Sequence, residues 1–363
     1  MTDQSYPQLF NVFPDLKERL SWVALVEAPT PLERLAGFPH SNLWIKRDDL
    51  TSSFYGGNKV RKLEFILADV LERGKDRVVT MGGLGTNHGL ATTLFCYRNG
   101  LDTTLLLSDQ PVTPHVKRHL RLFHRYGAEM VYAGSSLNTY LRFHTLERIR
   151  RFGAYFLPSG GSTPVGVLGF VNAVFELQSQ LDKHAVDEPD YIFCPLGSNG
   201  TLAGISLGLA LAGMRTKPVG VRVIDSHLGG IFPVATSGTV MRLMKRTYRY
   251  LRSITEMLPK ITLLPPRIIE DFFGEGYGAP TEQSRRAREV MESTAGLPLD
   301  PTYTAKTFAA VLDFLSTPEH AEDSVLYWHT FSAEERHDEA EKVDYQELPS
   351  EFHRFFEGEE IAE

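Results

Sequence analysis

Lys59 occupies a position in which a lysine side chain can act as a nucleophile. It follows the glycine pair Gly56-Gly57, and apolar residues recur at helical spacing after it. Asn58 is predicted as the N-cap of that helix, so Lys59 falls in its first turn, where the positive end of the helix dipole disfavours a cation. A lysine destabilised as a cation is a reactive amine, which Schiff-base chemistry requires. The alternative is a solvated lysine near an ordinary helix start.

A second segment has the residue types of a phosphate-binding loop. Gly197-Ser198-Asn199-Gly200-Thr201 stands between an apolar stretch and a helix of small residues. Glycines let a phosphate approach the backbone, the two hydroxyls can donate hydrogen bonds, and the helix N-terminus attracts a dianion. The segment lacks the lysine of a Walker A motif and does not match the dinucleotide spacing. A plain strand–helix turn is the alternative.

These segments and others occur in an order that resembles one enzyme family. The matching segments begin with Thr30-Pro31-Leu32, Ile45-Lys46-Arg47-Asp48-Asp49-Leu50 and Gly56-Gly57-Asn58-Lys59-Val60-Arg61-Lys62-Leu63-Glu64. Over roughly residues 25–330 the chain is similar to the pyridoxal-phosphate enzymes of fold type II, specifically the D-cysteine desulfhydrase and 1-aminocyclopropane-1-carboxylate deaminase family. The resemblance implies pyridoxal 5'-phosphate as the cofactor, a Schiff base between it and Lys59, and a fold like that of the tryptophan synthase β subunit.

The resemblance also implies roles for the residues around the cofactor. Residues 197–201 match the loop that binds the phosphate of the cofactor. Lys62 is either a second positive charge near that phosphate or a solvated helix lysine. Asn87 bonds the phenolic oxygen of the cofactor. Thr86, Asn87 and His88 hold the substrate carboxylate, and Thr86 is also a candidate catalytic residue. The alternative for Thr86 and Asn87 is helix capping alone.

Residues 300–304 bear on the choice of reaction. They read Asp-Pro-Thr-Tyr-Thr and resemble the family's Asp-Pro-x-Tyr segment, in which the residue after the tyrosine faces the pyridine nitrogen. The deaminase branch has a glutamate there, which keeps that nitrogen protonated. Thr304 instead leaves the nitrogen mostly unprotonated, so the pyridine ring is a weaker electron sink. Thr304 therefore favours α,β-elimination. Tyr303 and Tyr277 match two tyrosines that flank the substrate and can tune proton transfer, or else they pack with hydroxyls at the surface.

The sequence departs from the family pattern at three places. Thr86 stands where a serine is usual, and Gly89-Leu90-Ala91 replace polar residues after the histidine. Residues 329–332 read His-Thr-Phe-Ser where relatives have His-Thr-Gly-Gly, so Phe331 is expected to narrow or reshape the site. These departures bear on the identity of the substrate more than on the use of the cofactor.

We therefore expect a lyase that acts on a small amino acid, of D configuration as in D-cysteine. Elimination would give a keto acid, ammonia and a leaving group such as sulfide, and Lys59, released from the cofactor, would move the α-proton. One alternative is a 1-aminocyclopropane-1-carboxylate deaminase. The other is a protein that binds the cofactor without turning over any substrate.

Alternating strands and helices must position these residues. Apolar strands are predicted at 43–46, 78–81, 103–107, 129–132, 191–195, 218–224 and 325–328. Such alternation indicates an α/β fold with mostly parallel sheets covered by helices on both faces. At 363 residues two lobes are expected: a larger cofactor-binding lobe from 1–61 and 176–335, and a smaller lobe, 62–175, inserted in it. The cofactor is expected in the cleft between the lobes, at the carboxyl ends of strands.

The remaining segments have less specific signals. Residues 1–30 are expected to form a connector, 236–275 a helical region, and 336–363 an acidic peripheral tail with one or two helices. Cys96 and Cys194 lie in apolar stretches without metal-ligand spacing, so they are predicted to be buried, reduced thiols.

The composition excludes several classes of partner. A formal net charge of −7 with no basic face or tail argues against nucleic acid. The first ten residues do not have the pattern of a signal peptide, and no apolar run is long enough to cross a bilayer, so no membrane is expected and the cytoplasm is the predicted location. The histidines are scattered, so no metal site is expected. The family resemblance implies a homodimer.

Overall fold

The largest β-sheet forms the central layer of the larger lobe. The computed structural model describes residues 6–358, and within this range the sheet has six strands. They are β1 (Leu32–Arg34), β2 (Leu43–Arg47), β7 (Tyr191–Leu196), β8 (Lys217–Arg222), β11 (Arg267–Ile269) and β12 (Val325–His329). Their spatial order is β1-β2-β12-β7-β8-β11, and every pair is parallel except β1 with β2. The predicted parallel sheet is confirmed, with one antiparallel edge strand that the sequence pattern did not indicate.

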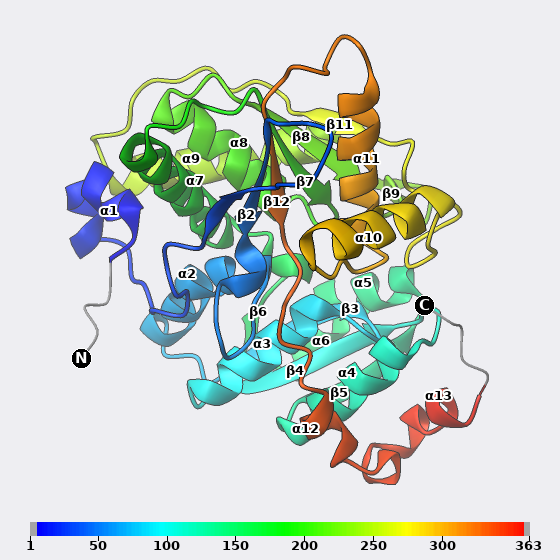
Figure 1. The fold of residues 1–363 in the computed structure, drawn as a ribbon. Helices are drawn as coiled ribbons and strands as arrows, with labels where there is room; N and C mark the ends of the chain where they lie inside the picture. Colours follow the sequence, from blue (N-terminus) through cyan, green and yellow to red (C-terminus); the bar gives the residue numbers. More distant parts are fainter. Residues whose placement is uncertain (1–5, 359–363) are drawn as a thin grey trace.

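A second, smaller sheet is parallel throughout. Its strands are β3 (Arg77–Gly83), β4 (Asp102–Ser108), β5 (Glu129–Gly134) and β6 (Tyr155–Phe156), in the order β5-β4-β3-β6. A short antiparallel hairpin joins β9 (His227–Leu228) to β10 (Phe232–Pro233). Figure 1 shows the smaller sheet, in cyan, below the larger one, so the two sheets belong to two lobes.

Helices connect the strands and cover the sheets. The α-helices are α1 (Gln8–Val12), α2 (Asn58–Glu72), α3 (Asn87–Arg98), α4 (Pro114–Arg125), α5 (Ser136–His144), α6 (Leu146–Arg150), α7 (Pro164–His184), α8 (Gly200–Ala212), α9 (Ser237–Ile254), α10 (Glu282–Ala295), α11 (Thr304–Ser316), α12 (His337–Glu341) and α13 (Arg354–Glu357). Short 3-10 helices are η1 (Pro14–Glu18), η2 (Asp48–Leu50), η3 (Ser159–Gly161), η4 (Tyr345–Glu347) and η5 (Ser350–Phe352).

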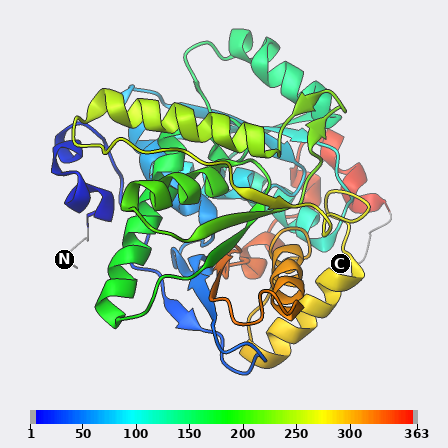
Figure 2. The ribbon, with the colours of Figure 1, turned by 90° about the horizontal axis from the view of Figure 1, so that it is seen from above.

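The larger sheet is buried on both faces because its side chains alternate between two cores. In β7, Ile192 and Cys194 pack with α7, α8 and α9, whereas Tyr191 and Phe193 pack with α10 and α11. Figure 2 shows α10 and α11, in gold and orange, on the opposite side of this sheet from α9. A strand buried on both faces is continuously apolar, which is the pattern that the sequence shows here.

One expectation about the chain outside the sheets needs correction. The region 236–275 was predicted to be helical, but α9 ends at Ile254, and the chain then runs without helix to β11. Pro259, Pro265 and Pro266 account for the difference, because proline removes a backbone donor and clashes within a helix. The N-terminal connector contains α1, whose Leu9 and Phe10 are buried in the core of the larger lobe.

The lobes meet along α2 and α7. Helix α7 is continuous over twenty-one residues, and its buried side chains join the core that includes α8 and α9. A lobe boundary at residue 175 would therefore divide a single helix. The acidic tail, expected to be peripheral, contributes Ala340, Val343, Leu348 and Phe352 to the core of the smaller lobe.

A cluster of buried charges ties α2 to its neighbours. Arg61 donates to both carboxylate oxygens of Asp48 (2.7 and 2.8 Å) and of Glu176 (3.0 Å each). Lys46 donates to Glu176 at 2.6 Å, and Trp328 donates its indole N–H to Asp48 at 2.7 Å. Two positive and two negative groups thus balance one another with almost no exposure to water. The cluster links β2, α2, α7 and β12 at one point.

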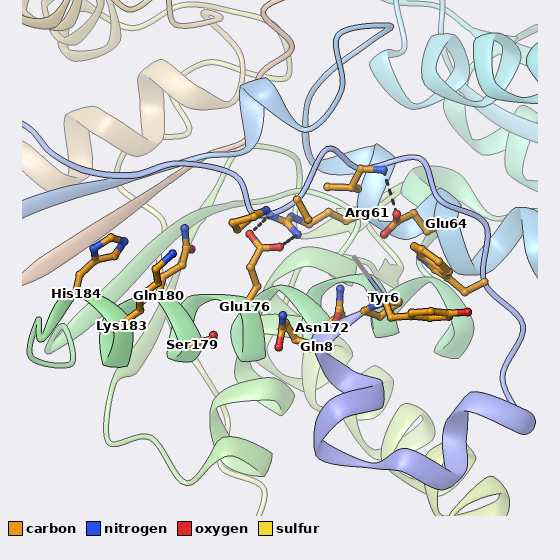
Figure 3. A pocket seen from close by; sticks show the side chains of 15 residues that line it. Tyr6, Gln8, Arg61, Glu64, Asn172, Glu176, Ser179, Gln180, Lys183 and His184 are labelled. Atoms are coloured by element: carbon orange, nitrogen blue, oxygen red, sulfur yellow. Dashed lines mark hydrogen bonds and ion pairs between the residues drawn. The ribbon is translucent and has the colours of Figure 1, made fainter. Parts of the chain in front are cut away.

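A cavity of about 190 Å³ borders this cluster on the side away from Lys59. Figure 3 shows Arg61 and Glu64 above α7, with Glu176 reaching up to Arg61; Tyr6 and Gln8 also line the cavity. At 100° per residue, Arg61 lies about 200° around α2 from Lys59, so the two side chains point in nearly opposite directions. The cavity is therefore separate from the predicted reactive lysine.

We predict that Glu176→Gln lowers the free energy of unfolding by about 3 to 5 kcal/mol, because it leaves buried cations short of one carboxylate. Burial raises the pKa of Glu176, but the charges of Arg61 and Lys46 outweigh that effect and lower the pKa to about 2. A carboxylate with a pKa below its unfolded value of about 4.3 stabilises the fold above that pH, and this stabilisation is lost as the pH falls from about 4 towards 2.

The measurement is urea unfolding of both proteins at several pH values. The matched control is Glu282→Gln, which removes a mostly exposed carboxylate and should change stability by less than about 0.5 kcal/mol. A difference between Glu176→Gln and the parent that does not shrink below pH 4 would contradict the electrostatic origin of the effect.

Candidate active site

Helix α2 begins where its first residues lie very close to the chain segment that follows β12. Gly57 is its N-cap, with a φ of 89°, and a Cβ there would lie 3.1 Å from the carbonyl oxygen of Thr330. The prediction that Asn58 is the N-cap is therefore wrong by one residue. Asn58 is the first helical residue instead, and its side chain donates to Thr201 (2.9 Å) and accepts from Lys59 Nζ (2.7 Å). Asn58 thus connects the lysine to the glycine-rich loop.

Lys59 is half-buried at this helix start. Loss of surrounding water lowers the pKa of its amine to about 8, against a smaller opposing effect of the negative charge of Asp300. A lysine with such a pKa has a much larger neutral fraction near neutral pH than an ordinary lysine. Its geometry and pKa suit a nucleophilic amine, as the sequence predicts.

The glycine-rich loop follows β7 and leads into α8. Its N-cap, Asn199, has a φ of 72°, and its side chain is held by the carbonyl of Val234 and the hydroxyl of Thr239. Ser162, from the turn before α7, accepts a hydrogen bond from Gly200 N (3.2 Å) and bonds Ser198 Oγ (3.0 Å). Ser162 was not predicted as a site residue, although its own turn is recognisably rich in glycine.

Lys62 faces this loop from α2. A Cβ at Gly200 would lie 2.8 Å from Lys62 Nζ, so the ammonium stands directly beside the loop. Lys62 is fully buried and donates to the carbonyl of Gly160 at 3.0 Å. Among residues 6–358 no carboxylate is recorded as its ion-pair partner, and burial, followed by the charge of Lys59, holds the pKa of Lys62 well below its usual value. Of the two alternatives for Lys62, the solvated lysine is therefore wrong.

These observations test whether the site fits pyridoxal phosphate. A buried ammonium without a counter-ion, backbone N–H groups at a helix N-terminus and a glycine that leaves room beside them together form a site for a dianion. Lys59 lies one helical turn from Lys62 and is positioned for a carbonyl group attached to the same ligand. The residues present therefore fit a small aromatic aldehyde that carries a phosphate.

The segment Thr86–His88 opens α3 after strand β3. Thr86 is the N-cap of α3, and its hydroxyl accepts from Gly89 N at 3.2 Å, so the capping alternative holds at least for this residue. His88 is buried, with Nε2 2.9 Å from the hydroxyl of Thr80, while its Nδ1 has no partner within the described part of the chain. Burial, and then the charges of the two lysines, keep the pKa of His88 well below its usual value, so the ring is neutral.

Tyr277 and Tyr303, which are predicted to flank the substrate, lie side by side, with their hydroxyl oxygens 2.7 Å apart. Burial raises the pKa of both phenols. The ring of Tyr303 reaches the start of the glycine-rich loop, where a Cβ at Gly197 would lie 3.4 Å from it. One hydroxyl of this pair donates to the other, which leaves the second with a proton to offer elsewhere.

Thr304 is buried, and its hydroxyl donates to the carboxylate of Asp300 at 2.6 Å while accepting from Asp300 N at 2.7 Å. Asp300 also accepts from the backbone N–H groups of residues 302–304. Sequence reasoning missed Asp300 as a site residue. Its signal was the Asp-Pro pair just ahead of a helix, a pattern typical of a side chain that caps a helix start.

The turn after β12 runs beside the start of α2. The carbonyl of Phe331 would lie 3.2 Å from a Cβ at Gly57, so the backbone at 330–331 closes one wall of the site. His329 is buried, with Nδ1 3.3 Å from the hydroxyl of Tyr327. Whether Phe331 narrows the substrate space stays a prediction.

The structure also bears on the predictions about the cysteines, metal ligands and membrane-spanning segments. Cys96 and Cys194 are free and buried, and burial raises the pKa of each thiol to about 12. Across residues 6–358 no group of three or more His, Cys, Asp or Glu side chains is arranged to hold a metal ion. No described helix is long and apolar enough to span a bilayer.

Three features define a pyridoxal-phosphate site. They are the two-lobed α/β fold, Lys59 at the start of a helix, and the glycine-rich loop 197–201 that can bind the phosphate. The sequence model of the family described as "Pyridoxal-phosphate dependent enzyme" matches residues 23–330, most of the chain. The chain therefore belongs to this family, and pyridoxal phosphate is its cofactor.

Three relatives support this assignment. A Pyrococcus horikoshii protein with the provisional name 1-aminocyclopropane-1-carboxylate deaminase is 33% identical over 90% of this chain and 94% of its own. A D-cysteine desulfhydrase of Salmonella paratyphi A is 29% identical over 87% of this chain and 95% of its own. The crystal structure of an ACC deaminase homologue aligns with a TM-score of 0.75, at 29% identity, over 90% of this chain and 95% of the other. The fold type II architecture predicted from the sequence is confirmed.

We predict that the apoprotein takes up pyridoxal phosphate at a rate that rises with pH up to about 8 and then levels off. The reason is that only the neutral amine of Lys59 attacks the aldehyde, and burial lowers its pKa to about 8. An ordinary lysine would give a rate that still rises at about pH 10. The measurement is the initial rate of growth of the cofactor's visible absorbance.

Borohydride reduction followed by peptide mapping identifies the attached residue. Lys59→Ala should show no covalent adduct, and label on Lys62 would overturn the assignment of Lys59 as the attachment site.

We also predict that Gly200→Ala weakens cofactor binding by about ten- to a hundredfold, the range expected when overpacking costs about 1 to 3 kcal/mol. The new methyl group would lie 2.8 Å from both Lys62 Nζ and Ser162 Oγ and would displace them from the loop. Equilibrium titration of the apoprotein measures the affinity. Gly238→Ala is the control, because a Cβ there has only Thr236 Oγ1 nearby, at 3.8 Å. Equal affinities for the two variants would mean that the phosphate binds elsewhere.

Proposed function

We propose that the protein is a lyase that eliminates a β-substituent from a small D-amino acid such as D-cysteine, releasing a keto acid, ammonia and sulfide. The observation that carries the proposal is the neutral side chain at position 304, where the hydroxyl of Thr304 is held by Asp300. A D-cysteine desulfhydrase is among the relatives of similar length, which supports the same reaction.

The cofactor supplies an electron sink for the α-carbon of a bound amino acid, and the chain supplies the proton transfers. The free amine of Lys59 would be the base for the α-proton, because its lowered pKa leaves much of the amine neutral near neutral pH. Lys62 and the loop 197–201 bind the phosphate and so fix the cofactor relative to Lys59. The proposal assigns the carboxylate of the substrate to the N-terminus of α3, at Thr86, Asn87 and His88.

The tyrosine pair is positioned to protonate a departing group. Only one of Tyr277 and Tyr303 donates within the pair, so the other retains a hydroxyl proton that can be given to a leaving thiolate. The raised pKa of both phenols keeps them protonated at neutral pH, which an acid requires. A good leaving group on the β-carbon places the least demand on the electron sink.

Deamination of 1-aminocyclopropane-1-carboxylate is the second candidate, favoured by the provisional names of relatives and by the solved homologue. Ring opening requires a longer-lived carbanion than elimination does, and Thr304 offers no carboxylate to support it. A protein that binds the cofactor without turnover is the third candidate, and the departures at Thr86, Gly89 and Phe331 are its support.

We further propose a cytoplasmic homodimer. The family resemblance leads to the dimer, and two buried, unpaired thiols fit a reducing compartment. Sedimentation analysis of the holoenzyme would decide the oligomeric state, and a single species with the mass of one chain would contradict the dimer.

The prediction is that D-cysteine and β-chloro-D-alanine release pyruvate, while 1-aminocyclopropane-1-carboxylate turns over at least about tenfold more slowly in kcat/KM, a difference of about 1.4 kcal/mol in barrier. Pyruvate or 2-oxobutyrate formation is measured with a coupled dehydrogenase, and the L-enantiomers serve as matched controls. Faster consumption of the cyclopropane than of every β-substituted amino acid would establish the deaminase instead. Cofactor absorbance that no amino acid perturbs would support the binding protein.

A further inference from the structure

The chain after β12 forms a strap along the smaller lobe. We define this C-terminal strap as residues 332–358, and Figure 1 shows it running from β12, in orange, down to α12 and α13, in red, beside the cyan lobe. The family match ends at residue 330, so the strap lies outside it. Leu348 and Phe352 of the strap are buried in the core of the smaller lobe, which anchors the far end of the strap there.

The near end of the strap contacts the lysine loop, residues 54–57, which leads directly into Lys59. Ser332 Oγ accepts from Gly56 N at 3.0 Å. The guanidinium of Arg336 donates twice to the carbonyl oxygen of Phe54, at 2.5 and 3.1 Å, and stacks 4.2 Å from the centre of the Phe54 ring. A single side chain of the strap thus holds both the backbone and the ring of the residue that opens this loop.

Arg336 is itself held in an unusual backbone conformation. Its φ of 53° is in the left-handed region, which non-glycine residues seldom occupy unless their surroundings enforce it. The other contacts of its side chain come from the smaller lobe and the strap, because Arg336 Nη1 donates to Tyr126, the C-cap residue of α4 (2.6 Å), and pairs with Glu339 of α12. Arg336 therefore joins the lysine loop to the smaller lobe.

A second route leads from the strap to the substrate loop, residues 84–88, at the start of α3. Arg118 of α4 lies 3.5 Å from Glu335 of the strap and 3.4 Å from Nδ1 of His115. His115 Nε2 lies 3.1 Å from the carbonyl oxygen of Gly85, the residue before Thr86. The strap thus reaches the backbone of the substrate loop through two side chains.

We propose that the C-terminal strap positions both loops of the active site, with Arg336 acting on the lysine loop and Arg118 on the substrate loop. Tyr55 of the lysine loop and Leu84 of the substrate loop are both buried in the core of the smaller lobe, and the strap contacts the first loop directly and reaches the second through two side chains. Misplacement of a reacting group by about 1 Å can cost a hundredfold in rate, so contacts that fix these loops bear directly on turnover. Arg336 and Arg118 are positioning residues, because they act through Phe54 and His115.

The first test compares Arg336→Ala with Arg354→Ala in the holoenzyme. Arg354 is the matched control because it also belongs to the strap and stacks on the ring of Tyr132 in the smaller lobe and on that of Phe355 in the strap, but it has no recorded contact with either loop. Hydrogen exchange should accelerate about ten- to a hundredfold at 54–57 in Arg336→Ala, the range set by losing hydrogen bonds from a charged donor, and should stay unchanged in Arg354→Ala. Equal acceleration in both variants, or none in Arg336→Ala, would overturn the proposal.

The second test separates positioning from loss of folded protein. Arg118→Gln should raise KM for the amino acid with a smaller change in kcat, because the substrate loop is displaced, whereas partial unfolding lowers apparent kcat and leaves KM unchanged. Arg336→Lys keeps the charge but not the two-pronged contact with Phe54, so it should restore little of the lost protection. Full rescue by lysine would show that charge alone is needed and would overturn the positioning role.

Ser332→Ala removes the acceptor of Gly56 N and the contacts of the same hydroxyl with the backbone of Glu334, but it keeps every contact of Arg336, so it provides a milder variant if Arg336→Ala does not fold. Hydrogen exchange at the amide of Gly56 should then become faster, with no change at residues 84–88. Unchanged exchange at Gly56 in that variant would contradict the proposal that the strap positions the lysine loop. The KM comparison rests on the proposed function, but the exchange measurements need no substrate. Failure of every amino acid to react would therefore refute the proposed function and leave the test of the strap intact.

Discussion

The buried guanidinium of Arg61 fixes the direction of α2, and the position of the reactive lysine depends on that direction. Arg61 reaches Asp48 and Glu176 with paired hydrogen bonds, which only a planar fork of donors can do. A rotation or a slip of α2 would leave these charges unpaired in the interior, at a cost of several kcal/mol. Lys59 is thus held in place from the opposite face of its helix by groups that never meet the substrate.

The face of α2 that carries Lys59 differs from the face of Arg61, because its positive charges are not paired with carboxylates in the described part of the chain. Lys59 and Lys62 lie one turn apart, Lys62 has no carboxylate partner within residues 6–358, and burial lowers the pKa of both amines. His88 is kept neutral by burial and by the same two charges. The site therefore holds an unbalanced positive potential, which a dianion at the glycine-rich loop would neutralise. Helix α2 thus carries two groups of charges. The paired charges around Arg61 fix the position of the helix, whereas the unpaired positive charges of Lys59 and Lys62 attract the phosphate of the cofactor.

Local signals in the sequence predicted most of the fold and the centre of the site. Strand–helix alternation, glycine-rich turns and the lysine at a helix start each depend on a few neighbouring residues, so they are visible without coordinates. The cap at Asn58 was misplaced by one residue, because Gly57 takes the positive φ that the turn needs. Ser162 and Arg336 were missed, because their contacts join segments far apart in the chain and leave no periodic pattern.

The choice between elimination and ring opening depends on more than residue 304. Asp300 already binds the hydroxyl of Thr304, and its carboxylate also accepts three backbone N–H groups at the start of α11. A glutamate at 304 would meet this carboxylate at close range, and two such groups share a proton rather than both ionise. The residue at 304 therefore sets the charge near the ring nitrogen only together with Asp300, whose carboxylate is held by the start of α11. The two positions form one electrostatic unit, so the choice of reaction depends on both.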